Sequence, residues 1–145
     1  MLIVVQRVSQ ASVTVSNEIV AQMNQGLLVL CGFESSDNSQ TIKKMLDKIL
    51  KYRIFSDEFD KMNYSVQDVS GGLLLVPQFT LIADTKKGLR PSFSNGAPPK
   101  LGQELFDQMK DQAQQAYEMV EFGIFGADMN VNLCNDGPVT FVMSF

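Results

Sequence analysis

Histidine and tryptophan are both absent from this 145-residue chain. Without histidine there is no Ser-His-Asp or Cys-His catalytic arrangement and no histidine-ligated metal. Only two cysteines occur, Cys31 and Cys134, and neither belongs to a CxxC pair, so a zinc site has no support. Each lies in an apolar strand-like segment, and we expect both to be buried free thiols. We expect neither a metal nor a cofactor.

Long apolar runs are also lacking. No stretch of the sequence is long enough to span a bilayer, and the apolar segment 2–5 is too short for a signal peptide and follows no basic region. We therefore expect a cytoplasmic protein without a membrane partner. With 45% hydrophobic and 19% charged residues, the composition is typical of one globular domain over residues 1–145.

An excess of positive charge is missing as well, since the net charge is −4. Overall charge therefore provides no nonspecific affinity for nucleic acid, and any contact with RNA needs a local basic patch. Lys86, Lys87 and Arg90 lie in one short segment and Arg7 lies elsewhere. A solvated charged loop is an equally good interpretation of the three clustered residues.

Two segments have helical periodicity. Apolar residues recur at helical spacing between 42 and 50, and Asp37 and Gln40 before them have the spacing of a capping box. Pro99 suits the first turn of a second helix, whose apolar face continues to Ala116. We expect both apolar faces to pack on the core.

The other apolar segments alternate or run unbroken, as strands do. Asn17-Glu18 is the expected turn of an early hairpin, which favours antiparallel pairing. The sequence predicts an α+β domain with mostly antiparallel curved sheets or a barrel and two main helices on the outside. About seven or eight strands are expected, at 2–8, 11–16, 19–23, 27–31, 73–80, 122–125, 129–134 and 141–145.

Two polar segments interrupt this strand-like sequence. Residues 77–81 end an apolar run with an amide and a hydroxyl, and residues 135–140 place a Gly-Pro pair inside an alternating segment. Proline removes a donor from a sheet ladder, so such a break presents backbone rather than side chain. We expect the function at these two breaks.

Five sequence motifs occur in the order in which a known protein family has them. Together they resemble the D-aminoacyl-tRNA deacylases over essentially the whole chain. That family hydrolyses the ester between a D-amino acid and tRNA, and it forms homodimers with active sites at the interface. The resemblance therefore implies the 3′ end of aminoacyl-tRNA and a second copy as partners. The motifs are Gln6-Arg7-Val8 with Ala11-Ser12-Val13, Tyr52 to Asp57, Gln78 to Leu81, Arg90 to Phe93, and Asn135 to Thr140.

The resemblance implies that Gln78, Phe79 and Thr80 form the catalytic pocket for the aminoacyl-adenosine end. Backbone N–H groups near Phe79 and Thr80 are candidate donors to the oxyanion. Thr80 is either a nucleophile or a hydroxyl that orients the substrate while the terminal ribose 2′-hydroxyl assists a water, and no base that would activate it is visible. Without the resemblance, Gln78 and Thr80 read as the polar face of a strand.

The resemblance further implies that Gly137 and Pro138 reach into the partner's pocket, joined by a cis peptide bond. Their carbonyl groups then form a wall against which an L-residue collides and a D-residue does not, while glycine is poorly excluded. Arg7 is implied to lie beside this element and to hold it. Met129 belongs to the same substrate-binding set, although its alternation equally suits a core residue.

The chain departs from the family pattern at Pro77, where serine is usual, and at Ile124, where arginine is common. Proline at that place is similar to related deacylases that clear L-alanine from mischarged tRNA, but Phe79 and the segment 135–140 favour the D-specific reading. We expect hydrolysis of D-aminoacyl-tRNA, and of Gly-tRNA mischarged on tRNA(Ala), as chiral proofreading in translation. The alternatives are a deacylase for L- or achiral mischarged tRNA, and a noncatalytic module that binds aminoacyl-tRNA.

Overall fold

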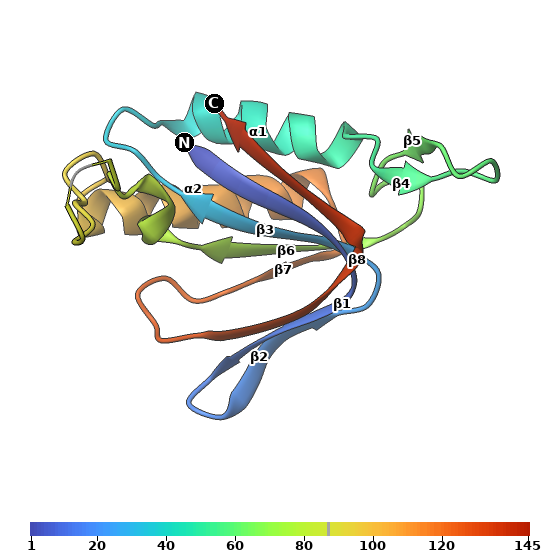
Figure 1. The fold of residues 1–145 in the computed structure, drawn as a ribbon, viewed down its shortest axis with the longest axis horizontal. Helices are drawn as coiled ribbons and strands as arrows, with labels where there is room; N and C mark the ends of the chain where they lie inside the picture. Colours follow the sequence, from blue (N-terminus) through green and yellow to red (C-terminus); the bar gives the residue numbers. More distant parts are fainter. Residues whose placement is uncertain (87) are drawn as a thin grey trace.

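The computed structural model describes residues 1–86 and 88–145. Lys87, one of the predicted basic residues, lies outside the described residues. The elements in chain order, drawn in Figure 1, are β1 (Leu2–Val15), β2 (Glu18–Met23), β3 (Gly26–Gly32), α1 (Ser39–Lys51), β4 (Phe55–Ser56), β5 (Met62–Tyr64), β6 (Gly72–Pro77), the 3-10 helix η1 (Phe79–Ile82), α2 (Pro99–Ala116), β7 (Val120–Phe122) and β8 (Asn130–Ser144).

β1 is the strand on which the sheet is assembled. Its first half lies between β3 and β8, and its second half lies between β2 and β8, always with antiparallel pairing. β6 and β7 extend the sheet from β3 as parallel strands. The order is β2-β1-β3-β6-β7, with β8 on the other edge of β1. This mostly antiparallel, curved sheet with two outer helices confirms the predicted fold class (Figure 1).

Alternate residues of β3 and β6 face two separate cores, which explains their unbroken apolar sequence. Leu27 and Leu73 face the larger core beneath α1 and α2, whereas Leu28 and Leu74 face a smaller core beneath the second half of β1 and β2. The predicted apolar stripe of α1 is confirmed as part of the larger core.

The ends of several predicted elements differ from the structure. The segments 2–8 and 11–16 form one strand, because β8 pairs with β1 along nearly its whole length across two irregularities in register. The hairpin turn is Ser16–Asn17, one residue earlier than predicted, and both residues have the positive φ that this turn requires. Pro99 does occupy the first turn of α2.

The cap of α1 is Asn38, whose side chain accepts hydrogen bonds from the backbone N–H groups of Gln40 and Thr41. The predicted capping box of Asp37 and Gln40 is therefore wrong. Asp37 is instead buried, because it accepts hydrogen bonds from the N-terminal ammonium of Met1 and from the backbone N–H of Glu34.

The N-terminal ammonium is itself buried and joins three segments. It lies 2.8 Å from Asp37 Oδ1 and 2.6 Å from Glu34 Oε2, and it donates to the carbonyl oxygen of Phe145 at 3.3 Å. The start of β1, the loop before α1 and the end of the chain therefore meet at one charged group. Buried charges are tolerated when they are paired in this way.

Membrane insertion through a helix finds no support, since none of the helices in the described ranges is both long and apolar enough to cross a bilayer.

The buried ammonium gives a stability prediction. Asp37→Asn removes the buried carboxylate partner and is expected to lower the free energy of unfolding by at least about 2 kcal/mol. Glu34 is partly exposed, so Glu34→Gln is the matched control and is expected to cost less than about 1 kcal/mol. Urea unfolding at pH 7 measures both, and equal losses for the two variants contradict the assignment.

Candidate functional site

β6 ends where its partner strand ends, and this places the first polar segment in a turn. Pro77 pairs opposite Cys31, and the backbone N–H of Gln78 donates to the carbonyl of Cys31 at 2.7 Å. The chain then turns into η1, which begins at Phe79. Gln78 and Thr80 are therefore not on the polar face of a strand, and the segment 78–80 is a bend between strand and helix in which Phe79 and Thr80 are exposed.

The Gln78 amide and the Thr80 hydroxyl interact within this bend. Gln78 Nε2 donates to Thr80 Oγ1 at 2.6 Å. Because an amide cannot accept the hydroxyl proton as a base would, this contact orients Thr80 without activating it. Among the described residues, the backbone N–H groups of Phe79 and Thr80 have no hydrogen-bond acceptor. The bend thus offers two free N–H donors beside an oriented hydroxyl, which suits a substrate carbonyl oxygen.

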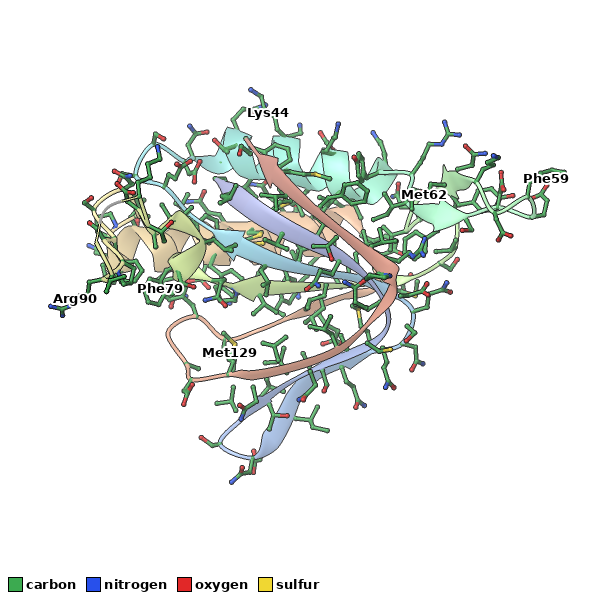
Figure 2. All side chains as sticks on the ribbon, viewed as in Figure 1. Lys44, Phe59, Met62, Phe79, Arg90 and Met129 are labelled. Atoms are coloured by element: carbon green, nitrogen blue, oxygen red, sulfur yellow. The ribbon has the colours of Figure 1, made fainter. Side chains whose placement is uncertain are left out.

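Met129 lies beside the same bend. A side chain at Gly123 would come within 3.0 Å of Met129 Sδ and 3.3 Å of Pro77 Cδ, so these two residues flank Gly123. Met129 is partly buried against the smaller core, and its sulfur accepts the backbone N–H of Ile124. Figure 2 shows Met129 and Phe79 at the same end of the molecule, opposite Phe59. The structure therefore places Met129 close to Pro77, the residue before the bend.

The second polar segment is a bulge of β8. Asn135 pairs opposite Val8 and Thr140 opposite Gln6, so four residues of β8 face Arg7 alone. Residues 136–139 are thus released from the sheet ladder. The Gly137–Pro138 peptide bond is cis, as the resemblance implied, and both residues are exposed.

Arg7 fills the space beneath this bulge. Its Nε donates to the carbonyl of Asp136 at 3.1 Å and lies 3.2 Å from the Asp136 carboxylate, and its Nη1 donates to the carbonyl of Ile54 at 2.7 Å. A methyl group on Gly137 would lie 3.0 Å from Arg7 Nη2, and Gly137 has φ +129°, which only glycine adopts easily. Arg7 is therefore a buried support of the bulge rather than a surface charge.

Asn135 closes the base of the bulge, a role that the sequence analysis did not assign. Its Oδ1 accepts the backbone N–H of Val139 at 2.9 Å, and its Nδ2 donates to Thr140 Oγ1 at 2.8 Å. Gln6 donates to the same hydroxyl at 3.3 Å. The signal was present in the motif 135–140, where an amide and a hydroxyl flank the Gly-Pro pair.

The two polar segments are far apart within one chain. The bend at Gln78 lies level with Cys31, which pairs with Ile3, whereas the bulge lies level with Arg7 on the same strand. Four residues of β1 separate these levels, a distance of about 13 Å along the strand. Figure 1 shows η1 on the side of the molecule where β1 begins, whereas the bend of β8 lies on the other side, near the middle of β1. One protomer alone does not combine Thr80 with Gly137 and Pro138.

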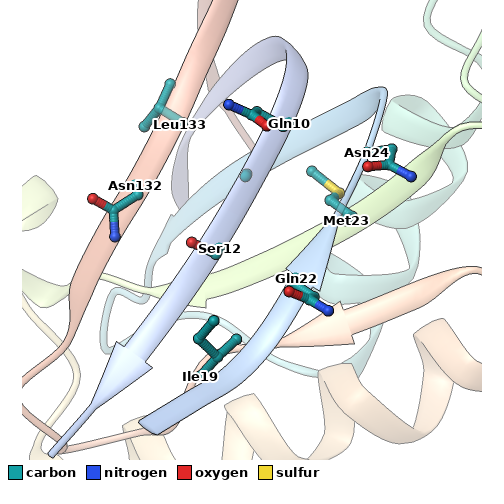
Figure 3. A pocket seen from close by; sticks show the side chains of 9 residues that line it. Gln10, Ser12, Ile19, Gln22, Met23, Asn24, Asn132 and Leu133 are labelled. Carbon is teal, nitrogen blue, oxygen red and sulfur yellow. The ribbon is translucent and has the colours of Figure 1, made fainter. Parts of the chain in front are cut away.

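A hollow of about 490 Å³ occurs elsewhere, on the outer side of β1, β2 and β8 (Figure 3). Its lining contains amides, a hydroxyl and apolar groups but no ionisable side chain, so it offers no acid, base or nucleophilic thiol. It includes neither polar segment, and we place the candidate site at the bend. The lining residues are Gln10, Ala11, Ser12, Ile19, Gln22, Met23, Asn24, Asn132 and Leu133.

The two cysteines have different surroundings. Cys31 is buried as expected, and this burial raises the pKa of its thiol, so the group stays protonated. Cys134 is exposed, so its predicted burial is wrong. It lies on β8, where β1 is the only partner strand among the described residues, so one edge of β8 is unpaired.

Comparison with known proteins identifies the family of this chain. A model of the D-Tyr-tRNA(Tyr) deacylase family matches residues 4–144. A D-aminoacyl-tRNA deacylase of Legionella pneumophila (strain Lens) is 59% identical over 145 residues, all of both chains. One of Pseudomonas fluorescens (strain SBW25) is 59% identical over 138 residues, 95% of each chain. A solved structure described as c-Myc DNA Unwinding Element Binding Protein has a TM-score of 0.94 and 37% identity, covering 100% of this chain and 99% of that chain.

The fold and the matches define a class, the hydrolases that deacylate aminoacyl-tRNA. Within that class, the chain belongs to the D-Tyr-tRNA(Tyr) deacylase family. The family resemblance seen in the motifs is thereby confirmed.

Proposed function

We propose that this enzyme is a homodimer that hydrolyses the ester of D-aminoacyl-tRNA, and of glycine mischarged on tRNA(Ala), as a proofreading step of translation. In this proposal Gln78, Phe79 and Thr80 of one subunit bind the aminoacyl-adenosine end. Gly137 and Pro138 of the second subunit complete the site.

The separation along β1 carries this proposal. The bend at 78–80 is open, with Phe79 and Thr80 exposed, and the bulge with Gly137 and Pro138 is exposed four residues further along β1, near the middle of that strand. Neither segment is a complete site by itself. A second copy related by a two-fold axis supplies each bend with the other's bulge, since such an interface uses the same surfaces twice.

Rigid backbone at the bulge accounts for selection by handedness. Arg7 and Asn135 hold residues 136–139 through main-chain groups, and neither Gly137 nor Pro138 has a polar side chain that could read the substrate. A fixed wall near the substrate α-carbon excludes an L-side chain by contact and leaves a D-side chain free. Because the side chain itself is not read, one pocket serves many D-amino acids, and glycine escapes exclusion.

The chemistry rests on the bend. An aminoacyl ester is already activated, and the free N–H groups of Phe79 and Thr80 are placed to stabilise the oxyanion that forms when water attacks. Gln78 holds the Thr80 hydroxyl toward the substrate. Since no base lies beside Thr80 among the residues that the structure describes, the terminal ribose 2′-hydroxyl is the group that assists the attacking water.

The alternatives remain distinguishable by experiment. A deacylase of L- or achiral mischarged tRNA uses the same bend without the wall. A noncatalytic module binds aminoacyl-tRNA and leaves the ester intact. One of the similar solved structures is described as a protein that binds a DNA unwinding element, but the net charge of −4 gives this chain no general affinity for nucleic acid.

A substrate panel tests the proposed specificity. We expect kcat/KM for D-Tyr-tRNA to exceed that for L-Tyr-tRNA by at least about 100-fold, the effect of a clash of ~3 kcal/mol. The kcat/KM for Gly-tRNA(Ala) is expected to lie within about tenfold of that for D-Tyr-tRNA, because the absence of a side chain changes kcat/KM only modestly. Release of radiolabelled amino acid measures all three rates. Similar rates for both tyrosine enantiomers support the first alternative, and intact esters throughout support the second.

Subunit mixing tests the shared site. Two bulky substitutions, Thr80→Arg at the bend and Gly137→Val at the bulge, are each expected to block the shared site and abolish most activity while keeping the wild-type circular dichroism spectrum. When the two variants are co-expressed with different tags, random pairing restores one intact site in each mixed dimer, or about a quarter of wild-type activity. If the mixture stays inactive, both halves of the site belong to one protomer. If either single variant stays fully active, the role assigned to that residue is wrong.

The role of Thr80 is tested by removing each hydroxyl in turn. Thr80→Ala is expected to lower kcat by less than about tenfold, whereas loss of a true nucleophile costs on the order of 10⁴ or more. Single-turnover hydrolysis of D-Tyr-tRNA ending in 2′-deoxyadenosine is expected to slow by at least about 100-fold, as for lost general acid–base assistance. An unchanged rate with the deoxy substrate overturns substrate assistance.

A further inference from the structure

Two exposed aromatic rings meet beside the bend. The Phe79 side chain is 65% exposed and that of Phe93 is 42% exposed, and their ring centroids lie 5.1 Å apart at 57°. Large aromatic rings that meet in solvent instead of in a core leave apolar faces available for stacking. Phe93 belongs to the motif 90–93, which the proposed reaction does not use.

The loop that carries Phe93 is anchored at both ends. Asp84 and Ser92 exchange two backbone hydrogen bonds, of 2.7 and 3.1 Å, directly after η1. Further along, the backbone N–H of Ala97 donates to the carbonyl of Phe33, and Ser35 Oγ donates to the carbonyl of Gly96. The Phe93 ring is therefore held next to Phe79 by its own backbone.

Cations accompany these rings. Lys86 and Arg90 are exposed in the same loop, and Figure 2 shows Arg90 projecting outward at the end of the molecule that carries Phe79. Asp84 is the acidic residue of this loop, and its carboxylate accepts the backbone N–H of Lys86. Positive charge beside stackable aromatic faces is the combination that binds single-stranded nucleic acid.

We propose that Phe79, Phe93 and Arg90 form a subsite for the single-stranded nucleotides that precede the terminal adenosine of tRNA. Phe93 and the outer face of Phe79 stack on one of the two cytosines of the CCA end, and Arg90 contacts a phosphate between them. This inference rests on the proposed function, since it assumes that the terminal adenosine lies at the bend. It gives an acidic protein a local means to hold RNA.

A purely structural role for Phe93 makes a different prediction. If the ring only positions Phe79, its removal disturbs the bend and lowers the rate for every substrate by the same factor. If the ring stacks on a cytosine, its removal matters only when that cytosine is present. The ratio of kcat/KM between a D-tyrosyl-CCA trinucleotide and D-tyrosyl-adenosine separates the two roles.

For the wild-type enzyme we expect this ratio to be about tenfold or higher, as stacking of one base provides. Phe93→Leu is expected to reduce the ratio to about a third of its wild-type value or less. Phe59→Leu is the control, because Phe59 is also an exposed ring and lies at the opposite end of the molecule, and it is expected to keep the ratio. A wild-type ratio near one, or equal losses on both substrates in Phe93→Leu, overturns the proposal.

Binding measurements test the subsite independently of catalysis. By calorimetry, the CCA trinucleotide without an attached amino acid is expected to bind at least about tenfold more tightly than adenosine monophosphate. Phe93→Leu is expected to remove most of this difference in affinity. Arg90→Gln is expected to reduce the slope of log K against log salt by about 0.7, as for one phosphate of a single strand. Lys61→Gln is the control, because Lys61 is an exposed cation two residues from Phe59, at the opposite end of the molecule, and it is expected to leave the slope unchanged. If neither ester is hydrolysed, the proposed function is wrong, but these titrations still test the subsite. Equal affinities for CCA and adenosine monophosphate would refute the subsite.

Discussion

The pairing of β1 is the constraint on which the other features depend. Because β1 pairs with β2, β3 and β8, its register with each of them fixes where the segments that follow these strands lie along the strand direction. The bend after β6 follows from the level at which β3 ends, and the bulge of β8 follows from the level of Arg7. Hydrogen-bonded strands do not slide without exchanging the faces of all their side chains. The distance between the two polar segments is therefore a fixed property of the fold.

Much of this fold is predictable from local patterns, and its limits have physical causes. The apolar stripe of α1 and the proline at the start of α2 reveal those helices because their signals lie within a few residues. Asp37 and Asn38 are both good N-caps, and Asp37 turns inward toward the Met1 ammonium, a partner that is distant in sequence. Similarly, the alternation around Cys134 is that of a strand, but whether another layer covers it depends on segments far away in sequence.

The candidate site was predictable in its parts and not in its arrangement. Gln78, Thr80, Gly137 and Pro138 stand out because amide, hydroxyl, glycine and proline interrupt apolar sequence. A local pattern cannot show that the partner strand ends at the level of Cys31, and the bend was therefore read as a strand. Nor does it show that Arg7 faces four residues of β8, because register is set by the whole ladder.

The buried ammonium of Met1 has a practical consequence. A tag fused ahead of Met1 replaces that charge by a neutral peptide group and forces a chain through the space between two carboxylates. Purified protein with such an extension would then be less stable to unfolding than the protein with a free N-terminus. Expression vectors for this enzyme should leave the first residue free, with any affinity handle cleaved off without remnant.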